Sequence, residues 1–162
     1  MPQSFLINPI GVVRKNDDGA RIEIFDKFAD GLLGLEGFSH IFVFYWFHQN
    51  DTPAKRKTLQ VHPRKDPRNP LTGVFATHSP LRPNLIALTL CKIVAITQNC
   101  IDIEEIDAYD GSPVIDIKCF VPASVEDKDV RLPDWIGQKT DNRKQKTENR
   151  GQKTEDRKQR TE

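Results

Sequence analysis

Short stretches in which apolar and polar residues alternate recur through the first 120 residues of this chain. The alternation is clearest in ARIEIF (residues 20–25), LIALTLCKIVAI (85–96) and PVIDIK (113–118). A period of two places the apolar side chains on one face of a β-strand, whereas an α-helix requires a period of 3.6. SHIFVFYWFH (39–48) and CIDIEEIDA (100–108) add β-branched and aromatic residues, which favour strands. The sequence therefore predicts a mainly β domain.

Turn and helix signals separate these predicted strands. NDDG (16–19) is a hairpin turn signal in which Gly19 is free to take a positive φ. The apolar spacing in DKFADGLLGLEGF (26–38) predicts one short helical segment that is ended by glycines. Many short strands in one small domain favour a closed or nearly closed barrel, because closure leaves no exposed strand edge. The expected fold is a compact, single-domain, all-β barrel with one or two short helices.

The C-terminal residues have a different composition. From Gln138 onward the chain reads QKTDNRK, QKTENRG, QKTEDRK and QRTE, a seven-residue repeat that contains no apolar residue. Heptads without apolar a and d positions do not form a coiled coil. So polar a segment buries too little surface to offset the entropy of ordering. We therefore expect a barrel domain over residues 1–137 and a disordered tail over residues 138–162.

The net charge of the whole chain differs from that of the predicted domain, because the tail is basic. The chain carries 24 basic and 23 acidic residues, of which the tail holds nine and five, so residues 1–137 hold 15 and 18. The predicted domain is thus not broadly cationic. One local run, AKRKTLQVHPRKDPR (54–68), is strongly basic and can neutralise phosphates, as in RNA binding; a solvated surface loop is the alternative. Its candidate RNA-binding residues are Lys55, Arg56, Lys57, Arg64, Lys65 and Arg68.

Cysteine and histidine spacing predicts neither disulfides nor a metal site. Cys91, Cys100 and Cys119 are odd in number, widely spaced and without a C-x-x-C pair. Cys91 lies in an apolar alternation, where a packed small hydrophobe is the expected role. His40 and His48 would lie about 26 Å apart on one strand, which is too far to share a metal ion. We expect no bound metal.

No stretch predicts a membrane span or a secretion signal. The longest apolar run, IFVFYWF (41–47), is too short to cross a bilayer. The N-terminal residues contain no charged leader followed by a long apolar stretch. The expected location is the reducing cytoplasm.

Three polar stretches lie where predicted strands end. FHQN (47–50) closes the aromatic strand, and GVFATHSPLRPN (73–84) opens like a buried strand and then becomes a loop stiffened by two prolines. IDAYDGSPVIDIK (106–118) contains a turn between two strands. Polar groups on stiff loops at strand ends are a common basis for a binding site. The alternatives are ordinary strand ends, a surface turn, and an Asp110 that only stabilises its own turn before Gly111.

Three motifs in this order, GLLGLEGFSHIFVFYWFH, GVFATHSPLRPN and DAYDGSPVIDIK, resemble the TsaA-like, or TrmO, family of tRNA methyltransferases. The resemblance covers about residues 5–122. It implies a compact β-barrel that binds S-adenosyl-L-methionine, usually dimerises, and takes the tRNA anticodon stem-loop as its partner. The implied reaction is methyl transfer to the N6 nitrogen of threonylcarbamoyladenosine, the purine 3′ of the anticodon at position 37.

The resemblance also implies which residues carry this activity. Cofactor contacts are expected at His48, Gln49, His78, Arg82, Asn84, Leu88, Asp107, Ala108, Tyr109 and Asp110. Asp110 is the hypothetical catalytic base, which would remove a proton from the acceptor nitrogen during attack. The anticodon loop would be held by residues 55–68, together with a second protomer.

Several features depart from the family pattern, and two of them concern residues expected to bind the cofactor. His78 stands where arginine is expected, which replaces a permanent cation by a group that titrates near neutrality. RKNDDGARIEI (14–24) turns back directly, without the Pro-Arg-Gln loop that the resemblance associates with cofactor binding. The sequence therefore leaves two alternatives open: a non-catalytic RNA- or ligand-binding barrel, and a methyltransferase that acts on another acceptor.

Overall fold

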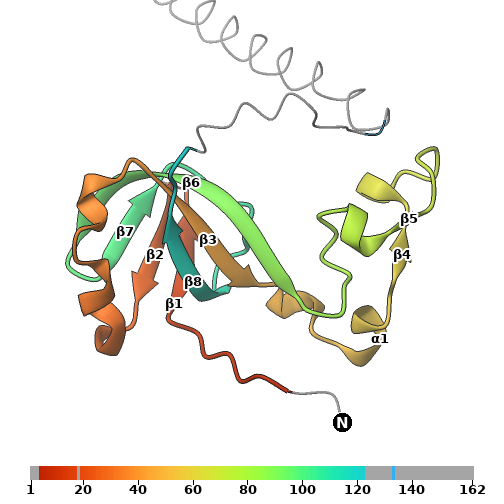
Figure 1. The fold of residues 1–162 in the computed structure, drawn as a ribbon, viewed down its shortest axis with the longest axis horizontal. Coiled ribbons are helices and arrows are strands. Elements are labelled where there is room, and N and C mark those ends of the chain that lie inside the picture. The colour runs from red at the N-terminus through yellow and green to blue at the C-terminus, as the bar shows by residue number, and fades with distance from the viewer. Residues whose placement is uncertain (1–3, 18, 123–132, 134–162) are drawn as a thin grey trace, which may run out of the picture. The chain divides into compact units, whose positions relative to one another are not determined.

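Six antiparallel strands close into a barrel in the order β1-β2-β7-β6-β3-β8, with β8 paired back to β1 (Figure 1). The structure is a computed structural model, and it describes residues 4–17, 19–122 and 133. The predicted mainly β barrel is confirmed, whereas the predicted boundary at residue 137 and the polar tail lie outside the described residues. The barrel strands are β1 (Gly11–Asn16), β2 (Gly19–Ile24), β3 (His40–Trp46), β6 (Ile86–Thr97), β7 (Cys100–Ile103) and β8 (Pro113–Cys119).

The helices of the described residues are short. The one α-helix among them is α1 (Pro53–Arg56), and no helix in this part of the chain is long and apolar enough to cross a membrane. The helical segment predicted over residues 26–38 is split in two by Gly34, whose φ of 83° is a backbone conformation that glycine adopts without steric cost. The 3-10 helices are η1 (Asp26–Leu32), η2 (Leu35–Gly37), η3 (His48–Asn50), η4 (Pro63–Lys65) and η5 (Val74–Ala76).

The segment between β3 and β6 leaves the barrel wall. It contains α1 and a separate two-stranded sheet, β4 (Gln60–Val61) paired with β5 (Thr72–Gly73), and these elements stand beside the barrel (Figure 1). The chain returns to the barrel at Leu85, which is completely buried. The predicted basic run therefore belongs to an excursion from the barrel and not to its wall.

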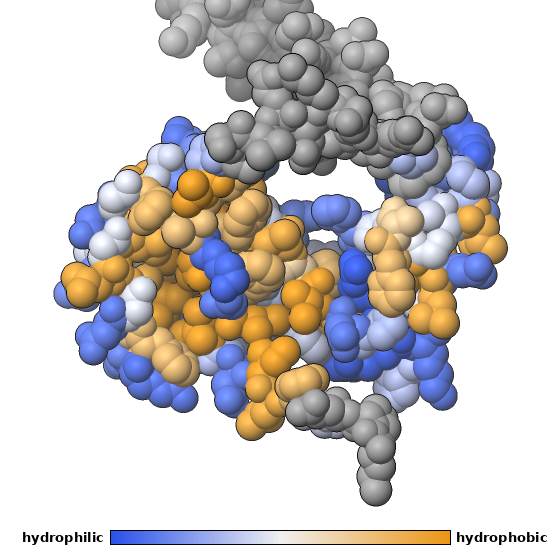
Figure 2. All heavy atoms as spheres, in the orientation of Figure 1, coloured by the Kyte–Doolittle hydropathy of each residue, from blue (hydrophilic) through white to orange (hydrophobic). Residues whose placement is uncertain are grey.

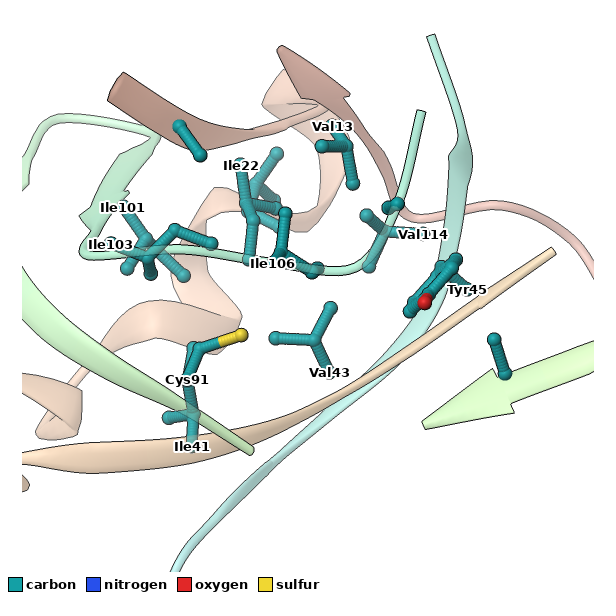
Figure 3. Packing of buried hydrophobic residues seen from close by; sticks show 14 residues of the cluster. Val13, Ile22, Ile41, Val43, Tyr45, Cys91, Ile101, Ile103, Ile106 and Val114 are labelled. Carbon is teal, nitrogen blue, oxygen red and sulfur yellow. The ribbon is translucent and has the colours of Figure 1, made fainter. Parts of the chain in front are cut away.

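Alternate residues of the six strands fill the barrel interior (Figure 3). Ile22 lies opposite Val13 on one neighbouring strand and opposite Ile101 on the other, and all three side chains are fully buried. Burial also raises the pKa of the Cys91 thiol to about 11, so this cysteine is a packed apolar group and not a nucleophile. The core cluster comprises Val13, Ala20, Ile22, Ile24, Ile41, Val43, Tyr45, Ala87, Cys91, Ile101, Ile103, Ile106, Ala108 and Val114.

Three of the predicted strand limits are wrong. The strand expected over residues 100–108 ends at Ile103. Two exposed residues then interrupt the alternation, and Ile106 and Ala108 are buried in the core from a loop, without pairing to a strand. The stretch that opens at Gly73 turns at once into η5, and His48 lies beyond the end of β3. A period of two reports which side chains are buried, and it does not distinguish strand pairing from a loop that contributes alternate side chains to the core.

Candidate functional site

The loop between β7 and β8, residues 104–112, is anchored to two barrel strands. The Tyr45 hydroxyl donates a hydrogen bond to the carbonyl oxygen of Asp107. Burial raises the pKa of Tyr45, which keeps this donor protonated. Lys15 contributes two contacts of 2.9 Å: its Nζ donates to the carbonyl oxygen of Ile106, and its backbone N–H donates to the Asp110 carboxylate. These contacts fix the loop from both sides.

The anchored β7–β8 loop presents polar groups on its outer side. Ile106 and Ala108 point into the core, whereas Asp107, Tyr109 and Asp110 are exposed. Tyr109 is 65% exposed, so its ring is free to pack against a ligand. Ala108 offers only its backbone, because its side chain is buried. Residues 107–110 of this loop therefore expose two carboxylates and one aromatic ring.

The stretch FHQN lies between this loop and the end of the R-P-N loop, residues 77–84. His48 Nδ1 is 3.3 Å from the hydroxyl of Ser112, whose side chain is buried at the end of the β7–β8 loop. The backbone N–H of Phe47 donates a 2.8 Å hydrogen bond to the carbonyl oxygen of Leu85, which directly follows the R-P-N loop. In the part of the chain that the structure describes, these contacts link the other two motifs to FHQN.

Hydroxyl groups shape the R-P-N loop from within. The Thr77 hydroxyl accepts the backbone N–H of Ser79 at 3.2 Å, and the Ser79 hydroxyl accepts that of Leu81 at 3.1 Å. Arg82 Nη1 lies 3.4 Å and 3.5 Å from the carbonyl oxygens of Thr77 and Ser79. These are long contacts, so the guanidinium is held weakly and can exchange them for an anionic ligand. A polar loop is therefore present at the predicted position, with hydrogen bonds between its own residues.

The other predicted cofactor contacts surround these elements. His78 and Asn84 are exposed on the R-P-N loop, and Gln49 is exposed on η3. Leu88 lies on the outer face of β6, directly opposite Phe44, and is 47% exposed. A ligand that touches both Leu88 and the loops must therefore lie at the barrel rim or on its outer wall, and not inside the barrel.

Four of the six predicted RNA-binding cations, Arg64 among them, already interact within the protein. Arg56 pairs with Asp51, and Arg68 pairs with Asp66 at 2.7 Å. Lys55 Nζ donates a 3.0 Å hydrogen bond to the carbonyl oxygen of Gln49. Asp66 lies within the basic run itself, and Asp51 precedes it, so two carboxylates oppose these cations. Two further cations of the set, Lys57 and Lys65, are exposed.

The residues that anchor the β7–β8 loop are not among those predicted from the sequence. Tyr45 was detectable in principle, because the alternation of its strand places it inward with Ile41 and Val43, and a buried hydroxyl needs a hydrogen-bond partner. No sequence pattern predicts the contacts of Lys15 and Ser112, because the residues that they contact lie far away in the chain. Among the described residues, no three His, Cys, Asp or Glu side chains are grouped so that they could hold a metal ion.

Residues 8–126 match the model of the tRNA-methyltransferase O N-terminal domain family. The chain belongs to this family. The resemblance seen in the sequence is thereby confirmed. The TrmO match includes all six barrel strands, both loops and FHQN, so that every candidate site residue lies within the matched region.

Individual relatives agree with the TrmO assignment. A probable S-adenosyl-L-methionine-binding protein of Methanocaldococcus jannaschii is 52% identical over 116 residues, which cover 72% of this chain and 92% of that protein. A human tRNA (adenine(37)-N6)-methyltransferase is 40% identical over 101 residues, or 62% of this chain and 22% of that protein. A crystal structure of TrmO from Pseudomonas aeruginosa superposes with a TM-score of 0.60 at 25% identity and covers 80% of this chain. The match spans 62% of the crystallised chain.

Proposed function

We propose that this chain is an S-adenosyl-L-methionine-dependent tRNA methyltransferase, which methylates the N6 nitrogen of threonylcarbamoyladenosine at position 37. The observation that carries the proposal is the placement of FHQN between two loops that are distant in sequence. His48 contacts Ser112 on one side, and Phe47 is bonded to Leu85 on the other. The human relative is a tRNA (adenine(37)-N6)-methyltransferase, which supports the N6 position at residue 37 of tRNA, and the M. jannaschii relative, a probable S-adenosyl-L-methionine-binding protein, supports the cofactor.

The exposed side chains suit the chemical parts of S-adenosyl-L-methionine. The ring of Tyr109 can stack on the adenine, and the Asp107 carboxylate can accept hydrogen bonds from ribose hydroxyls. The guanidinium of Arg82 can pair with the amino-acid carboxylate. When bound, the cofactor supplies an electrophilic methyl group on a sulfonium. Further contacts are proposed at His48, Gln49, His78, Asn84, Leu88 and the backbone of Ala108.

Asp110 is proposed as the base. The lone pair of the acceptor nitrogen is delocalised into the purine and the carbamoyl group, so removal of the N6 proton during attack should raise its nucleophilicity. The Asp110 carboxylate is exposed, and its Oδ1 is held by the backbone N–H of Lys15. This contact orients the carboxylate, and we assign the proton to its other oxygen. The remaining task of the site is to align donor and acceptor and to exclude water.

The basic excursion is proposed to hold the anticodon stem-loop. Residues 55–68 lie beside the barrel with α1, β4 and β5 (Figure 1). Arg64 and Lys65 both have a φ of 58°, an uncommon conformation for residues other than glycine. Both side chains are exposed. A compact loop that exposes two neighbouring cations favours a phosphate-binding role for the excursion over the role of a plain solvated linker.

We also propose that the protein is a homodimer. Hydrophobic side chains gather over the barrel surface (Figure 2). On the outer face of β6, Ile86, Leu88 and Leu90 are 36%, 47% and 46% exposed. An exposed apolar strip of this kind favours a protein partner. Sedimentation velocity should give the mass of a dimer, and Leu90→Lys should shift it to the monomer. A monomeric wild type would contradict the proposal.

Nucleoside mass spectrometry tests the proposed reaction. Transfer RNA from a strain that lacks the gene should lose the methylated threonylcarbamoyl nucleoside and retain the unmethylated one. The purified chain with S-adenosyl-L-methionine should restore the methyl group. Calorimetry with the same cofactor separates the alternatives. Absence of binding would contradict the enzyme and favour a barrel that senses another ligand, whereas binding with the nucleoside unchanged would favour another acceptor.

A further inference from the structure

Arg56, one of the cations in the predicted RNA-binding set, is engaged by three groups of the protein itself. Its Nε and Nη2 lie 2.7 Å and 3.1 Å from the two carboxylate oxygens of Asp51. Its Nη1 donates a 3.0 Å hydrogen bond to the carbonyl oxygen of Pro83. Its guanidinium carbon is 5.2 Å from the centre of the Trp46 ring. All three guanidinium nitrogens are therefore used within the protein, together with one face of the group.

Asp51 is itself held in place. The indole N–H of Trp46 donates to its Oδ2 at 2.9 Å, so the carboxylate receives hydrogen bonds from two side chains. The hydrogen bonds from Arg56 and Trp46 hold the pKa of Asp51 below its usual range. Trp46, Asp51 and Arg56 thus form a connected unit, here called the β3 clamp, where β3 ends and α1 follows. Because each member has more than one contact, the orientation of the guanidinium is well determined.

The hydrogen bond from Arg56 to Pro83 connects the β3 clamp to the R-P-N loop, where cofactor contacts are proposed. Pro83 stands between Arg82 and Asn84, the two polar side chains of the R-P-N motif. Its carbonyl oxygen is the atom to which Arg56 donates. Hydrogen bonds within the R-P-N loop shape its first half, from Thr77 to Leu81, and the Arg56 contact holds its second half against α1.

We propose that Arg56 is a positioning residue, which uses Asp51 and Trp46 as supports to hold the R-P-N loop in the conformation that binds the cofactor. The proposal rests on the proposed function for the identity of that cofactor, S-adenosyl-L-methionine. Arginine suits this role because its planar group offers several donors in fixed directions, whereas lysine is a point charge with one nitrogen. A cation that only neutralised a phosphate would not need this arrangement.

The comparison of Arg56→Lys with Lys57→Ala separates positioning of the R-P-N loop from electrostatic binding of RNA phosphates. Arg56→Lys keeps the charge. It should raise the Kd for S-adenosyl-L-methionine, measured by calorimetry without RNA, about tenfold. Its RNA affinity should keep the wild-type salt dependence. Lys57→Ala should leave the cofactor Kd unchanged and reduce the salt slope of RNA binding by about one. Wild-type cofactor affinity in Arg56→Lys would overturn the proposal.

Amide hydrogen exchange without any ligand gives a second measurement, which does not depend on the proposed function. Arg56→Lys should increase exchange at Ser79 and Leu81, whose backbone N–H groups are hydrogen-bonded within the R-P-N loop, while β3 and β6 keep their wild-type protection. Asp51→Asn should give the same pattern, because it weakens the support of the guanidinium. If the wild type does not bind S-adenosyl-L-methionine, the proposed function fails, and the exchange pattern still decides the positioning role. Unchanged exchange in both variants would overturn it.

Discussion

Asp110→Asn should lower the turnover number for methyl transfer by about 100-fold, while S-adenosyl-L-methionine still binds. The substitution is nearly isosteric, and the amide oxygen of asparagine can still accept the backbone N–H of Lys15, which Asp110 accepts at 2.9 Å. The β7–β8 loop should therefore keep its anchor, although the side chain can no longer take a proton. Single-turnover transfer to a threonylcarbamoyl-modified anticodon stem-loop measures the rate, and calorimetry measures cofactor binding.

Asp107→Asn is the matched control for this prediction. Asp107 carries the same functional group on the same exposed loop, and its backbone carbonyl, not its side chain, holds the loop to Tyr45. We expect this variant to weaken cofactor binding and to change the turnover number by less than about tenfold. An unchanged turnover number in Asp110→Asn would remove Asp110 from the role of base and leave it as a loop anchor.

The double variant Lys57→Glu with Lys65→Glu should lower the affinity for the anticodon stem-loop by about 100-fold at low salt. Both lysines are exposed, so reversing their charges removes two potential phosphate contacts and adds repulsion between the new carboxylates and the RNA phosphates. The plot of log affinity against log salt should become shallower by about two, because two fewer counterions are released. Fluorescence anisotropy over a salt series measures both quantities.

A charge-matched variant controls for the change in net charge. Lys27 and Lys118 lie on η1 and β8, outside residues 55–68, and Lys118 pairs with Asp116 at a solvent-exposed position. Lys27→Glu with Lys118→Glu alters the net charge by the same amount and should change RNA affinity by less than about threefold. Equal losses in the two double variants would mean that the field of the whole protein, and not the basic excursion, governs RNA binding.

Much of the barrel was predictable because its strands bury one face. In β3, Ile41, Val43 and Tyr45 point inward, and this alternation is written directly in the residue order. The same local signal overextended the strand that begins at Cys100, since Ile106 is buried from a loop. Burial periodicity depends on neighbouring residues, whereas strand pairing depends on partners far along the chain.

The candidate site was predictable only as separate pieces. Motif resemblance placed His48, Arg82 and Asp110 in three stretches, and their order was sufficient to indicate the TrmO family. The contact of His48 with Ser112, 64 residues away, and the use of Tyr45 as a loop anchor required the folded chain. Neither contact has a periodic or compositional signature.

The residue order by itself determined the strand-forming alternation, the β class and the family, because these depend on side-chain chemistry and spacing along the chain. Tertiary structure alone decided what each charged group does. Arg56 and Lys57 are adjacent basic residues with the same predicted role, yet Arg56 is bound to Asp51 and Pro83 and Lys57 is exposed. The reason is geometric: the folded chain brings the carbonyl oxygen of Pro83, 27 residues away, within hydrogen-bond distance of Arg56, and the residue order does not specify that contact.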